Sequence, residues 1–507
     1  VSQFYTKDVF MKNKILLLSA PFSAKSSTGP KMEHHGLCYI KACLIYHGFQ
    51  VHMIDGNAME IPWHEAINQL NFDDYFLTGF SVYSTNYNNS VKLIKAIRNS
   101  GYSGHITMGG HYPTFSWNMI LKNNTGLDSV ITGEGENPAV ALAKAMTSGK
   151  DWKYIEGLAC RKDEEIVCNP CGALINPLNF PFLPDRDSYG ELLKKQNFAT
   201  ISSSRGCWGN CTFCSVRTFY KLGQGPCWRP RTAEDIVDEI EHLNKNGISN
   251  FAFCDDNFMG VGKEGKHRAG RIGEEIIRRK LDIAYAIDCR PDDVDEDLLS
   301  FLSGSGLVKV NIGIESFVER QQKLYSKTIS HKMIEDAILL LKKQDFLIGL
   351  YTIFFDPFVT FEELSVNFNK ALTTGPEYFP EFATFLQVFP GIPLYEDIKK
   401  QNLLDTHRVL VTKDNEYSIN YRFQNPGIEE FFVMCLHFEA ILNDLLAPFT
   451  GTSILSPEKY YDLYKHMRKL ACNCFLEGIE HMKWQESGYI EGWIEEGKKL
   501  VEVKSEK

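Results

Sequence analysis

The sequence has 507 residues, of which 44% are hydrophobic, so it can form two to four domains that each bury a core of their own. Its formal net charge is −10 with no long block of Lys or Arg, which disfavours a nucleic-acid partner, and no uninterrupted apolar run approaches the roughly 18 to 20 residues needed to span a membrane. Fourteen scattered cysteines and a start without an export signal predict reduced thiols and a cytoplasmic location.

The first 150 residues alternate short apolar runs with stretches of helical period. Runs such as KILLLSAP and HITMGG predict strands, whereas HGLCYIKACLIYHG and NSVKLIKAIRNSG predict helices. Strands and helices in alternation form a parallel sheet with helices on both faces. We therefore predict a doubly wound, Rossmann-like α/β domain over residues 1–150, with its ligand site at the carboxyl ends of the strands.

Three further regions follow along the chain. Residues 151–195 predict a hairpin, ACRKDEEIVCNPCGALI, and a proline-rich linker, NPLNFPFLPDRDSY. Six strand-and-helix units over residues 196–400 are typical of a partial (β/α)6 barrel of the TIM type, with its chemistry at the carboxyl ends of the strands. Residues 401–507 predict a mainly helical C-terminal region that packs on the barrel or covers its mouth.

The segment SSSRGCWGNCTFCSV places Cys207, Cys211 and Cys214 in a C-x-x-x-C-x-x-C array after a predicted strand. On a helix the three thiols would share one face as small apolar groups, but Gly206 and Gly209 favour a loop. A structural zinc site takes four ligands, and no Cys or His follows at a familiar pairing distance. The remaining interpretation is an iron–sulfur cluster with one iron left open for a ligand.

This spacing, with the aromatic Phe213 before the third cysteine and a six-unit barrel after it, resembles the radical S-adenosylmethionine (SAM) enzymes. The resemblance implies that the three cysteines hold a 4Fe-4S cluster whose open iron binds the amino and carboxylate groups of SAM. It also implies that one electron, from a donor such as flavodoxin or ferredoxin, cleaves SAM to methionine and a 5'-deoxyadenosyl radical.

The resemblance extends to other strand ends of the barrel, where CDDNF and NIGIES occupy positions that contact SAM in this family. Glu315 can pair with the ammonium or ribose of the ligand, while Ser316 can cap a helix. Arg290 can bind a carboxylate of the ligand or form a salt bridge with Asp292 or Asp293. The predicted SAM-binding residues are Phe213, Asp255, Asp256, Asn257, Arg290, Glu315 and Ser316.

The first domain lacks both the G-x-G-x-x-G turn of dinucleotide sites and the G-x-x-x-x-G-K-[ST] loop of triphosphate sites. It has three loops of small residues instead, GFSVYSTN, MGGHYPT and TGEGEN, which let a large flat ligand approach the backbone. Ahead of a radical SAM barrel, these loops resemble the cobalamin-binding domain of cobalamin-dependent radical SAM enzymes. The predicted cobalamin-binding residues are Ser81, Tyr83, Thr85, Asn86, Gly109, Gly110, His111, Pro113, Gly133, Glu134, Gly135 and Glu136.

The D-x-H-x-x-G motif, which supplies a histidine beneath cobalt in many cobalamin domains, is absent, and EHHG at 33–36 has a different spacing. We therefore expect cobalamin without a histidine lower axial ligand, with a side chain such as Tyr83 shielding that face. His111 is expected at the nucleotide tail or a corrin amide, or else as a turn histidine that bonds its own backbone.

The pair of domains implies a cobalamin-dependent radical SAM methyltransferase, which methylates an unactivated carbon of a small molecule, peptide or natural-product intermediate through methylcobalamin and a 5'-deoxyadenosyl radical. The alternative is a cyclase or ring-rearrangement enzyme that uses cobalamin without net methylation, because the motifs belong to the cofactors and not to the substrate. A methylthiotransferase is disfavoured by the lack of a second three-cysteine site, and a corrinoid carrier would leave the cysteine triad unexplained. The pairs Cys168/Cys171 and Cys472/Cys474 lack matching pairs and are expected to be reduced thiols.

Overall fold

The computed structural model describes residues 13–22, 31–58, 63–176, 178–327, 329–405, 408–411, 416–450 and 456–505. Two segments considered in the sequence analysis lie outside the described residues. They are residues 1–12, which were expected to carry no export signal, and residues 23–30, in the turn after the first strand.

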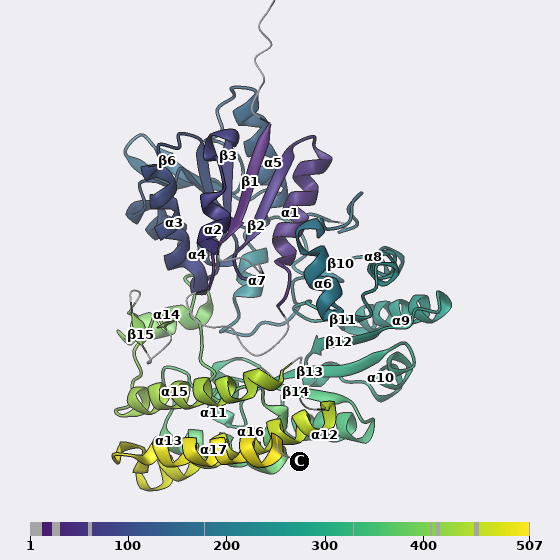
Figure 1. Ribbon diagram of the computed structural model, residues 1–507, viewed down its shortest axis with the longest axis vertical. Helices are drawn as coiled ribbons and strands as arrows, with labels where there is room; N and C mark the ends of the chain where they lie inside the picture. Colours follow the sequence, from purple (N-terminus) through teal and green to yellow (C-terminus); the bar gives the residue numbers. More distant parts are fainter. Residues whose placement is uncertain are drawn as a thin grey trace, which may run out of the picture.

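The N-terminal part is a seven-stranded sheet in the order β2-β1-β3-β4-β5-β6-β7 (Figure 1). Its strands are β1 (Lys14–Ser19), β2 (Gln50–Asp55), β3 (Leu77–Ser81), β4 (His105–Gly109), β5 (Ser129–Ile131), β6 (Leu158–Lys162) and β7 (Glu165–Cys168). Its helices are α1 (His35–Tyr46), α2 (Trp63–Asn68), α3 (Tyr87–Asn99), α4 (His111–Asn123) and α5 (Glu136–Thr147). β1 to β5 are parallel, and the hairpin β6–β7 extends the sheet in antiparallel pairing.

Both faces of this sheet are buried. Ile15 and Leu17 of β1 belong to the core that contains α1 and α5, whereas Leu16 and Leu18 join a second core with α3 and α4. Strands buried on both faces read as continuous apolar runs, which is why KILLLS shows no polar alternation. The doubly wound α/β fold expected from the sequence is confirmed.

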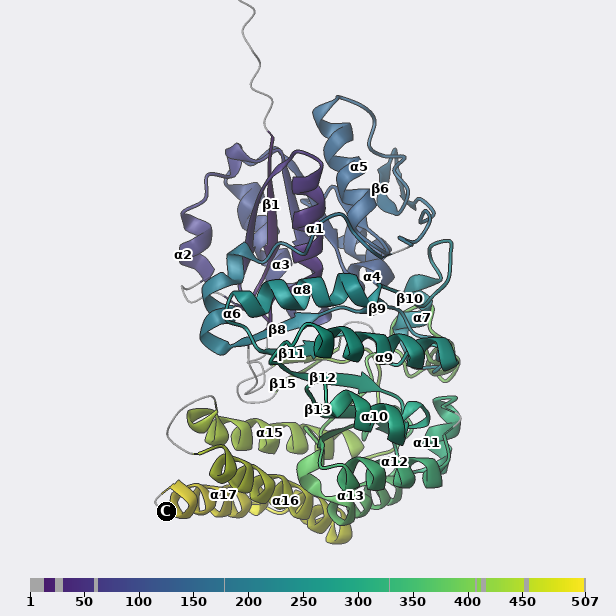
Figure 2. The same cartoon turned by 90° about the vertical axis from the view of Figure 1, so that its right-hand side faces the viewer.

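The central part is a five-stranded parallel sheet in the order β14-β13-β12-β11-β8, with helices α8, α9, α10, α12 and α13 along its outer side (Figure 2). Its strands are β8 (Phe198–Ile201), β11 (Asn250–Phe253), β12 (Ala284–Cys289), β13 (Leu307–Glu315) and β14 (Leu347–Thr352). Its helices are α6 (Gly190–Gln196), α7 (Ser215–Tyr220), α8 (Ala233–Lys245), α9 (Gly262–Arg278), α10 (Glu296–Ser303), α11 (Glu319–Leu324), α12 (His331–Lys343) and α13 (Phe361–Thr374). The sixth expected unit contributes a single parallel bridge, between Phe355 and Phe385, in place of a full strand.

The last part is mainly helical, and its yellow-green C-terminal helices lie in the lower part of Figure 1. It contains α14 (Pro393–Lys400), the short strands β15 (Val409–Val411) and β16 (Glu416–Ser418), α15 (Ile428–Leu446), α16 (Pro457–His481) and α17 (Tyr489–Ser505). Within the described chain, one segment, Ile428–Phe449, has the length and apolar composition of a membrane span. Its Phe431 and Phe432 are buried against Phe355, as in the core helix of a globular protein. The domain boundaries near residues 150, 195 and 400 stay predictions.

A buried ion-pair network joins the two sheets. Arg186, in the linker, contacts Glu33 before α1 at 3.2 Å and Glu239 of α8 at 2.7 Å, and Arg231 contacts Glu239 at 2.5 Å. The side chains of both glutamates are fully buried. Because these residues come from separate parts of the chain, the network sets the orientation of the first sheet on the second.

Candidate active site between the two sheets

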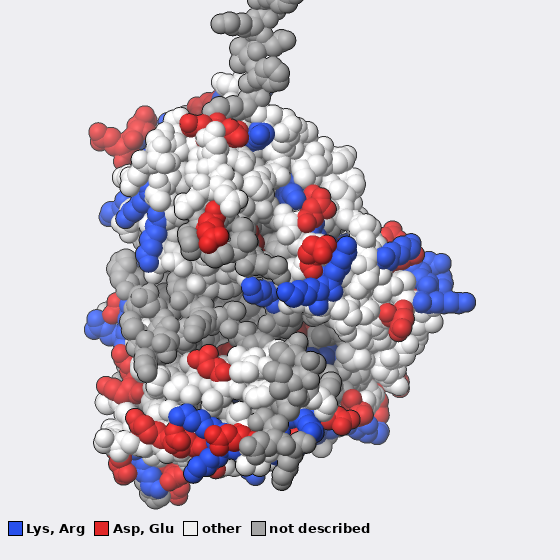
Figure 3. Space-filling view, viewed as in Figure 1, with Lys and Arg blue, Asp and Glu red and all other residues white. Residues whose placement is uncertain are grey.

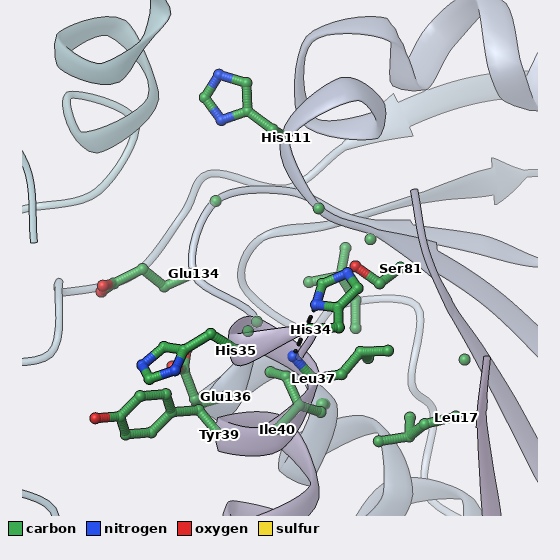
Figure 4. A pocket seen from close by; sticks show the side chains of 18 of the residues that line it. Leu17, His34, His35, Leu37, Tyr39, Ile40, Ser81, His111, Glu134 and Glu136 are labelled. Atoms are coloured by element: carbon green, nitrogen blue, oxygen red, sulfur yellow. Dashed lines mark hydrogen bonds between the residues drawn. The ribbon is translucent and has the colours of Figure 1, made fainter. Parts of the chain in front are cut away.

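A cavity of about 460 Å³ lies between the carboxyl ends of the strands of both sheets. The first sheet contributes the start of α1 and the loops that follow β3, β4 and β5 (Figure 4). The second contributes Ser204, Arg205, Cys254, Asp256 and helix α7. One continuous space therefore touches both the loops expected to bind cobalamin and the strand ends expected to bind SAM.

Most of the predicted cobalamin-binding residues line this cavity, namely Ser81, Tyr83, Gly109, Gly110, His111, Gly133, Glu134, Gly135 and Glu136. Thr85, Asn86 and Pro113 lie outside its wall. Asn86 supports the loop from behind, because its Oδ1 accepts from the Tyr83 N–H at 2.8 Å and its Nδ2 donates to the Ala20 carbonyl at 3.2 Å. Tyr83 lines the cavity with 42% of its surface exposed, and its ring meets that of Phe22 edge-on at 6.3 Å.

Two glycines allow close packing beside the cavity. Gly110 has φ +107°, and a Cβ there would come within 3.0 Å of the Val82 carbonyl oxygen. A Cβ on Gly79 in β3 would lie 3.1 Å from Leu17. Behind the loops the cavity continues as an apolar slot between the sheet and helices α1 and α5, lined by Ile15, Leu17, Leu37, Ile40, Leu77 and Leu142.

His34 and His35 also line the cavity, although sequence reasoning set the EHHG segment aside. His34 is the N-cap of α1, and its Nδ1 accepts a hydrogen bond from the Leu37 N–H at 3.3 Å. Burial lowers the pKa of His34, so the ring is neutral and its proton resides on Nε2. Among the described residues this buried Nε2 has no partner, and the ring lies 5.4 Å from that of Tyr83. The signal in the sequence was a polar residue just before an apolar helical run, the position of an N-cap.

His111 faces the second sheet. Its Nε2 lies 2.5 Å from the Ser215 hydroxyl, and its ring stacks on Phe219 at 5.1 Å. Burial lowers the pKa of His111 to about 4, so the ring is neutral at pH 7. Because Ser215 directly follows Cys214, His111 connects the loop after β4 to the cysteine loop. The sequence predicted either a contact of His111 with cobalamin or a bond to its own backbone, and neither prediction included this connection.

The two glutamates of the TGEGEN loop bind arginines. Arg205 donates to Glu134 at 2.8 Å and to Glu136 at 2.5 Å, and Arg229 donates to Glu134 at 3.0 Å. Burial would raise the pKa of Glu134, but the two arginines outweigh it and lower the pKa. The carboxylates predicted to contact cobalamin are thus already paired, and they fix the loop against β9 (Ser204–Arg205) and β10 (Arg229–Pro230).

The three cysteines form a loop between β9 and α7 at the mouth of the barrel. Gly206 before them has φ +83°, and a Cβ there would clash with the carbonyl of Cys227. The Gly209 N–H donates to the Cys207 sulfur at 3.3 Å, and Arg290 Nη1 lies 3.8 Å from the Cys211 sulfur. In the described part of the chain no three Cys, His, Asp or Glu side chains come close enough to share a single metal ion.

The surroundings of the thiols disfavour free thiolates. Burial raises the pKa of all three cysteines, to about 12 for Cys214, so they stay protonated without a metal. Metal binding displaces those protons. Donors to the sulfur atoms, here from Gly209 and Arg290, are the outer contacts that tune a metal centre.

The predicted SAM-binding residues divide into two groups. Asp256 faces the cavity, accepts from the Gly206 N–H at 3.0 Å, and has a pKa raised to about 6 by burial. Asp255 instead accepts from the backbone N–H groups of Ser203 and Ser204, at 2.8 and 2.6 Å. Asn257 donates to Asp293 at 2.8 Å. Asp255 and Asn257 therefore support the loops around the cavity from within the protein.

Glu315 ends β13 with φ +60°, a left-handed conformation that is strained for a residue with a Cβ. Its Oε1 accepts from Lys327 Nζ at 2.5 Å, and Lys327 also donates to the Gly313 carbonyl. Ser316 is buried, and its hydroxyl accepts from the Val318 N–H at 2.9 Å and lies 3.1 Å from Asn367 Oδ1. Ser316 thus organises the turn, while strain of the kind seen at Glu315 is common at ligand sites.

Phe213 and Arg290 are both held by neighbours. The ring of Phe213 meets that of Tyr325 edge-on at 5.2 Å. Arg290 forms the salt bridge to Asp292 at 2.8 Å that was one of its two expected roles, and its guanidinium stacks 4.6 Å from the ring of Trp208. These contacts place Arg290 beside the cysteine loop.

Comparisons with known proteins agree with this geometry. The family model of the radical SAM superfamily matches residues 201–368, and the B12 binding domain matches residues 25–143. This chain carries a radical SAM domain and a B12-binding domain. The radical SAM match begins at the end of β8 and contains all three cysteines.

Relatives and solved structures extend the similarity over most of this radical SAM enzyme. An uncharacterized methyltransferase of Pyrococcus horikoshii is 27% identical over 405 residues, 78% of this chain and 84% of that protein. An anaerobic magnesium-protoporphyrin IX monomethyl ester cyclase of Synechocystis is 27% identical over 396 residues, 74% of this chain and 75% of that protein. The cobalamin-dependent radical SAM enzyme OxsB, solved with aqua-cobalamin, matches with a TM-score of 0.76 and 16% identity over 97% of this chain and 80% of its own, a likeness of fold.

The cofactors of this radical SAM enzyme are a 4Fe-4S cluster, SAM and cobalamin. The residues present fit them: three thiols with donors to their sulfur atoms, an apolar slot beside Gly79, and two polar atoms without a partner in the described chain, His34 Nε2 and Ser204 Oγ, at the cavity. Which residue contacts which cofactor stays a prediction.

Proposed function

We propose that this protein is a cobalamin-dependent methyltransferase that transfers a methyl group to an unactivated carbon of a small-molecule or natural-product intermediate. The observation that carries the proposal is the single cavity walled by the loops of the first sheet and by Ser204, Cys254 and Asp256 of the second. A corrin held on one wall and SAM held on the other would share this space. When bound, the cluster and SAM supply a carbon-centred radical, and cobalamin supplies a methyl group.

The residues of this chain would divide the work of binding. Cys207, Cys211 and Cys214 would hold the cluster. Asp256 would face the cationic SAM, because its pKa of about 6 leaves it ionised at neutral pH. Tyr83 would shield the lower face of cobalamin, which receives no histidine ligand.

Ion pairs at the wall of the cavity would help to exclude bulk water. Arg205, with Glu134 and Glu136, closes the seam between the sheets beside the cavity. Excluding water matters here, because a reactive radical must meet its substrate before it meets solvent.

The partners follow from the chemistry. The enzyme would receive electrons from flavodoxin or ferredoxin and would act in the cytoplasm on a small molecule or peptide. Acidic and basic side chains are interspersed on the face seen in Figure 3, as expected for a protein that does not track nucleic acid.

Ring formation or rearrangement without net methylation is the second candidate, because the relative from Synechocystis is named as a cyclase. The two functions differ in their products. Methyl transfer releases S-adenosylhomocysteine together with 5'-deoxyadenosine, whereas rearrangement releases 5'-deoxyadenosine alone.

The test is an anaerobic incubation of the reconstituted enzyme with a reductant, SAM carrying a deuterated methyl group, and fractionated small molecules from the source cells. We expect both nucleoside products and a substrate that gains the label. If a fraction raised 5'-deoxyadenosine without S-adenosylhomocysteine and without label, methyl transfer would be abandoned for rearrangement.

A further inference from the structure

The inner face of the central sheet is unlike its outer face. Residues that point outward, such as Ile287, Val310 and Ile312, are apolar and buried against the helices. Parallel sheets in α/β proteins usually bury both faces in apolar contacts. Here the pairs Asp288↔Asn311, Asn311↔Gly349 and Ala286↔Lys309 set polar and small residues in register on the opposite face.

Lys309 is the first unusual member of this inner face. It is half-buried, and within the described chain its ammonium makes no ion pair or hydrogen bond. Burial lowers the pKa of Lys309, while Asp288 acts in the opposite direction without touching it. A partly desolvated cation that lacks a counterion is costly to maintain, so such a group is expected to receive an anion from a ligand.

Asp288 and Tyr351 complete the polar surface. Asp288 Oδ1 accepts from Asn311 Nδ2 at 2.7 Å, which leaves its second oxygen for another partner. Tyr351 is 44% exposed although it lies inside β14, and its hydroxyl is unbonded in the described part of the chain. Both are the last residue but one of their strands, so they lie near the strand ends.

Lys309 lies deeper. It is the third residue of β13, two positions before Asn311, and two residues of a strand span roughly 7 Å. Ala252 and Ala286 are small residues on this face, whereas the space above Gly349 is taken by the side chain of Asn311. A ligand along this face would have its charged end at Lys309 and its other end towards the cysteine loop.

We propose that the substrate carries an anionic group, a carboxylate or a phosphate, which Lys309 binds deep in the barrel. Tyr351 and Asp288 bind a hydroxyl or amine of the substrate nearer the strand ends. The carbon that reacts is then directed at the cavity. This inference rests on the proposed function, because it names the substrate class of the same active site.

The test measures anion binding without turnover, by calorimetric titration of the enzyme loaded with cluster, cobalamin and SAM. The probes are inorganic phosphate and acetate. The probe that binds with the higher affinity indicates whether the substrate carries a phosphate or a carboxylate. We expect Lys309→Gln to weaken binding at least tenfold and Lys309→Arg to retain it. We expect Asp288→Asn to strengthen it severalfold, because the variant removes a nearby negative charge.

The matched control is Lys332→Gln, which removes an exposed lysine from its ion pair with Asp336 and should leave anion binding unchanged. Equal iron and cobalamin content in each variant shows that it has folded. Equal affinity in wild type and Lys309→Gln, or no binding of either anion, would overturn the proposal. Because no methyl transfer is measured, a failed methylation assay would count against the proposed function and leave this site standing.

Discussion

At the scale of single residues, the chemistry depends on what each side chain has already bound. Glu134 and Glu136 lie in a loop expected to hold cobalamin, yet both carboxylates are already ion-paired with Arg205. His34, set aside because its spacing was unfamiliar, keeps a free N–H at the cavity. A polar residue in a motif is available to a ligand only when the fold leaves its hydrogen-bonding atoms unpaired.

The tautomer of His34 leads to the first prediction. Because Nδ1 accepts from the Leu37 N–H, Nε2 carries the proton and can donate a hydrogen bond but cannot ligate cobalt. His34→Ala should weaken cobalamin binding by about 1 kcal/mol, roughly fivefold, since one hydrogen bond is lost. The electron paramagnetic resonance spectrum of the bound Co(II) form should lack histidine nitrogen splitting in both proteins. Nitrogen splitting that disappears in the variant would identify His34 as the lower ligand.

The second prediction concerns the cysteine triad. Cys211→Ala should lose most of its iron after anaerobic reconstitution, because two thiolates cannot hold a 4Fe-4S cluster against exchange. Cys227→Ala is the control, since its backbone touches the cysteine loop at Gly206 while its thiol belongs to another segment. Full iron content in the Cys211 variant would show that this loop does not hold the cluster.

At the scale of elements, the strand-end loops are shaped by backbone conformation. Gly110 follows β4 with φ +107° and lies against the Val82 carbonyl, so the loops after β3 and β4 approach each other closely. The neighbouring hydrogen bond from the Val82 N–H to the Gly109 carbonyl, 2.9 Å long, continues the pairing of the two strands beyond their ends. The cavity wall is therefore continuous with the sheet.

The third prediction follows from this contact. Gly110→Ala should destabilise the fold by about 1–3 kcal/mol through backbone strain, and it should also reduce cobalamin binding because the loops must separate. Gly101→Ala is the control, because Gly101 also has a positive φ, +92°, but a Cβ added there would meet no atom of the described residues within 4 Å. The control should lower the melting temperature and leave cobalamin content unchanged. Full cobalamin binding by the Gly110 variant would contradict a role for this wall.

At the scale of the whole molecule, function requires that two sheets keep a fixed relation. The network of Glu33, Arg186, Arg231 and Glu239 supplies part of this relation from a buried position. Burial alone would raise the pKa of Glu239, but Arg186 and Arg231 outweigh it and lower the pKa to about 2. The carboxylate is therefore charged throughout the physiological range.

The fourth prediction concerns this network. Glu239→Gln removes the carboxylate that two buried arginines share and leaves them only Glu33 and Asp235, which should cost about 3 kcal/mol of unfolding free energy. Because the folded pKa lies below the ordinary value of 4.5, the stabilisation is fully present above pH 4.5 and is lost only as the pH falls towards 2. The difference in melting temperature from wild type should thus be constant between pH 5 and 8.

The matched control is Glu234→Gln on the same helix, which removes an exposed pair with Arg271 and should cost less than about 1 kcal/mol. A Glu239 variant as stable as this control would show that the network does not hold the sheets together.

The sequence by itself determined the two folds, because apolar runs such as KILLLS and the serial strand-helix units record which faces are buried. It also determined the cysteine loop, since the spacing of Cys207, Cys211 and Cys214 is local. Only the tertiary structure decided that Glu134 pairs with Arg205, that His111 meets Ser215, and that Lys309 faces the barrel interior with no counterion among the described residues. These facts join residues that are distant in the chain or depend on the pairing of strands, and local patterns do not encode which distant partner a polar group will find.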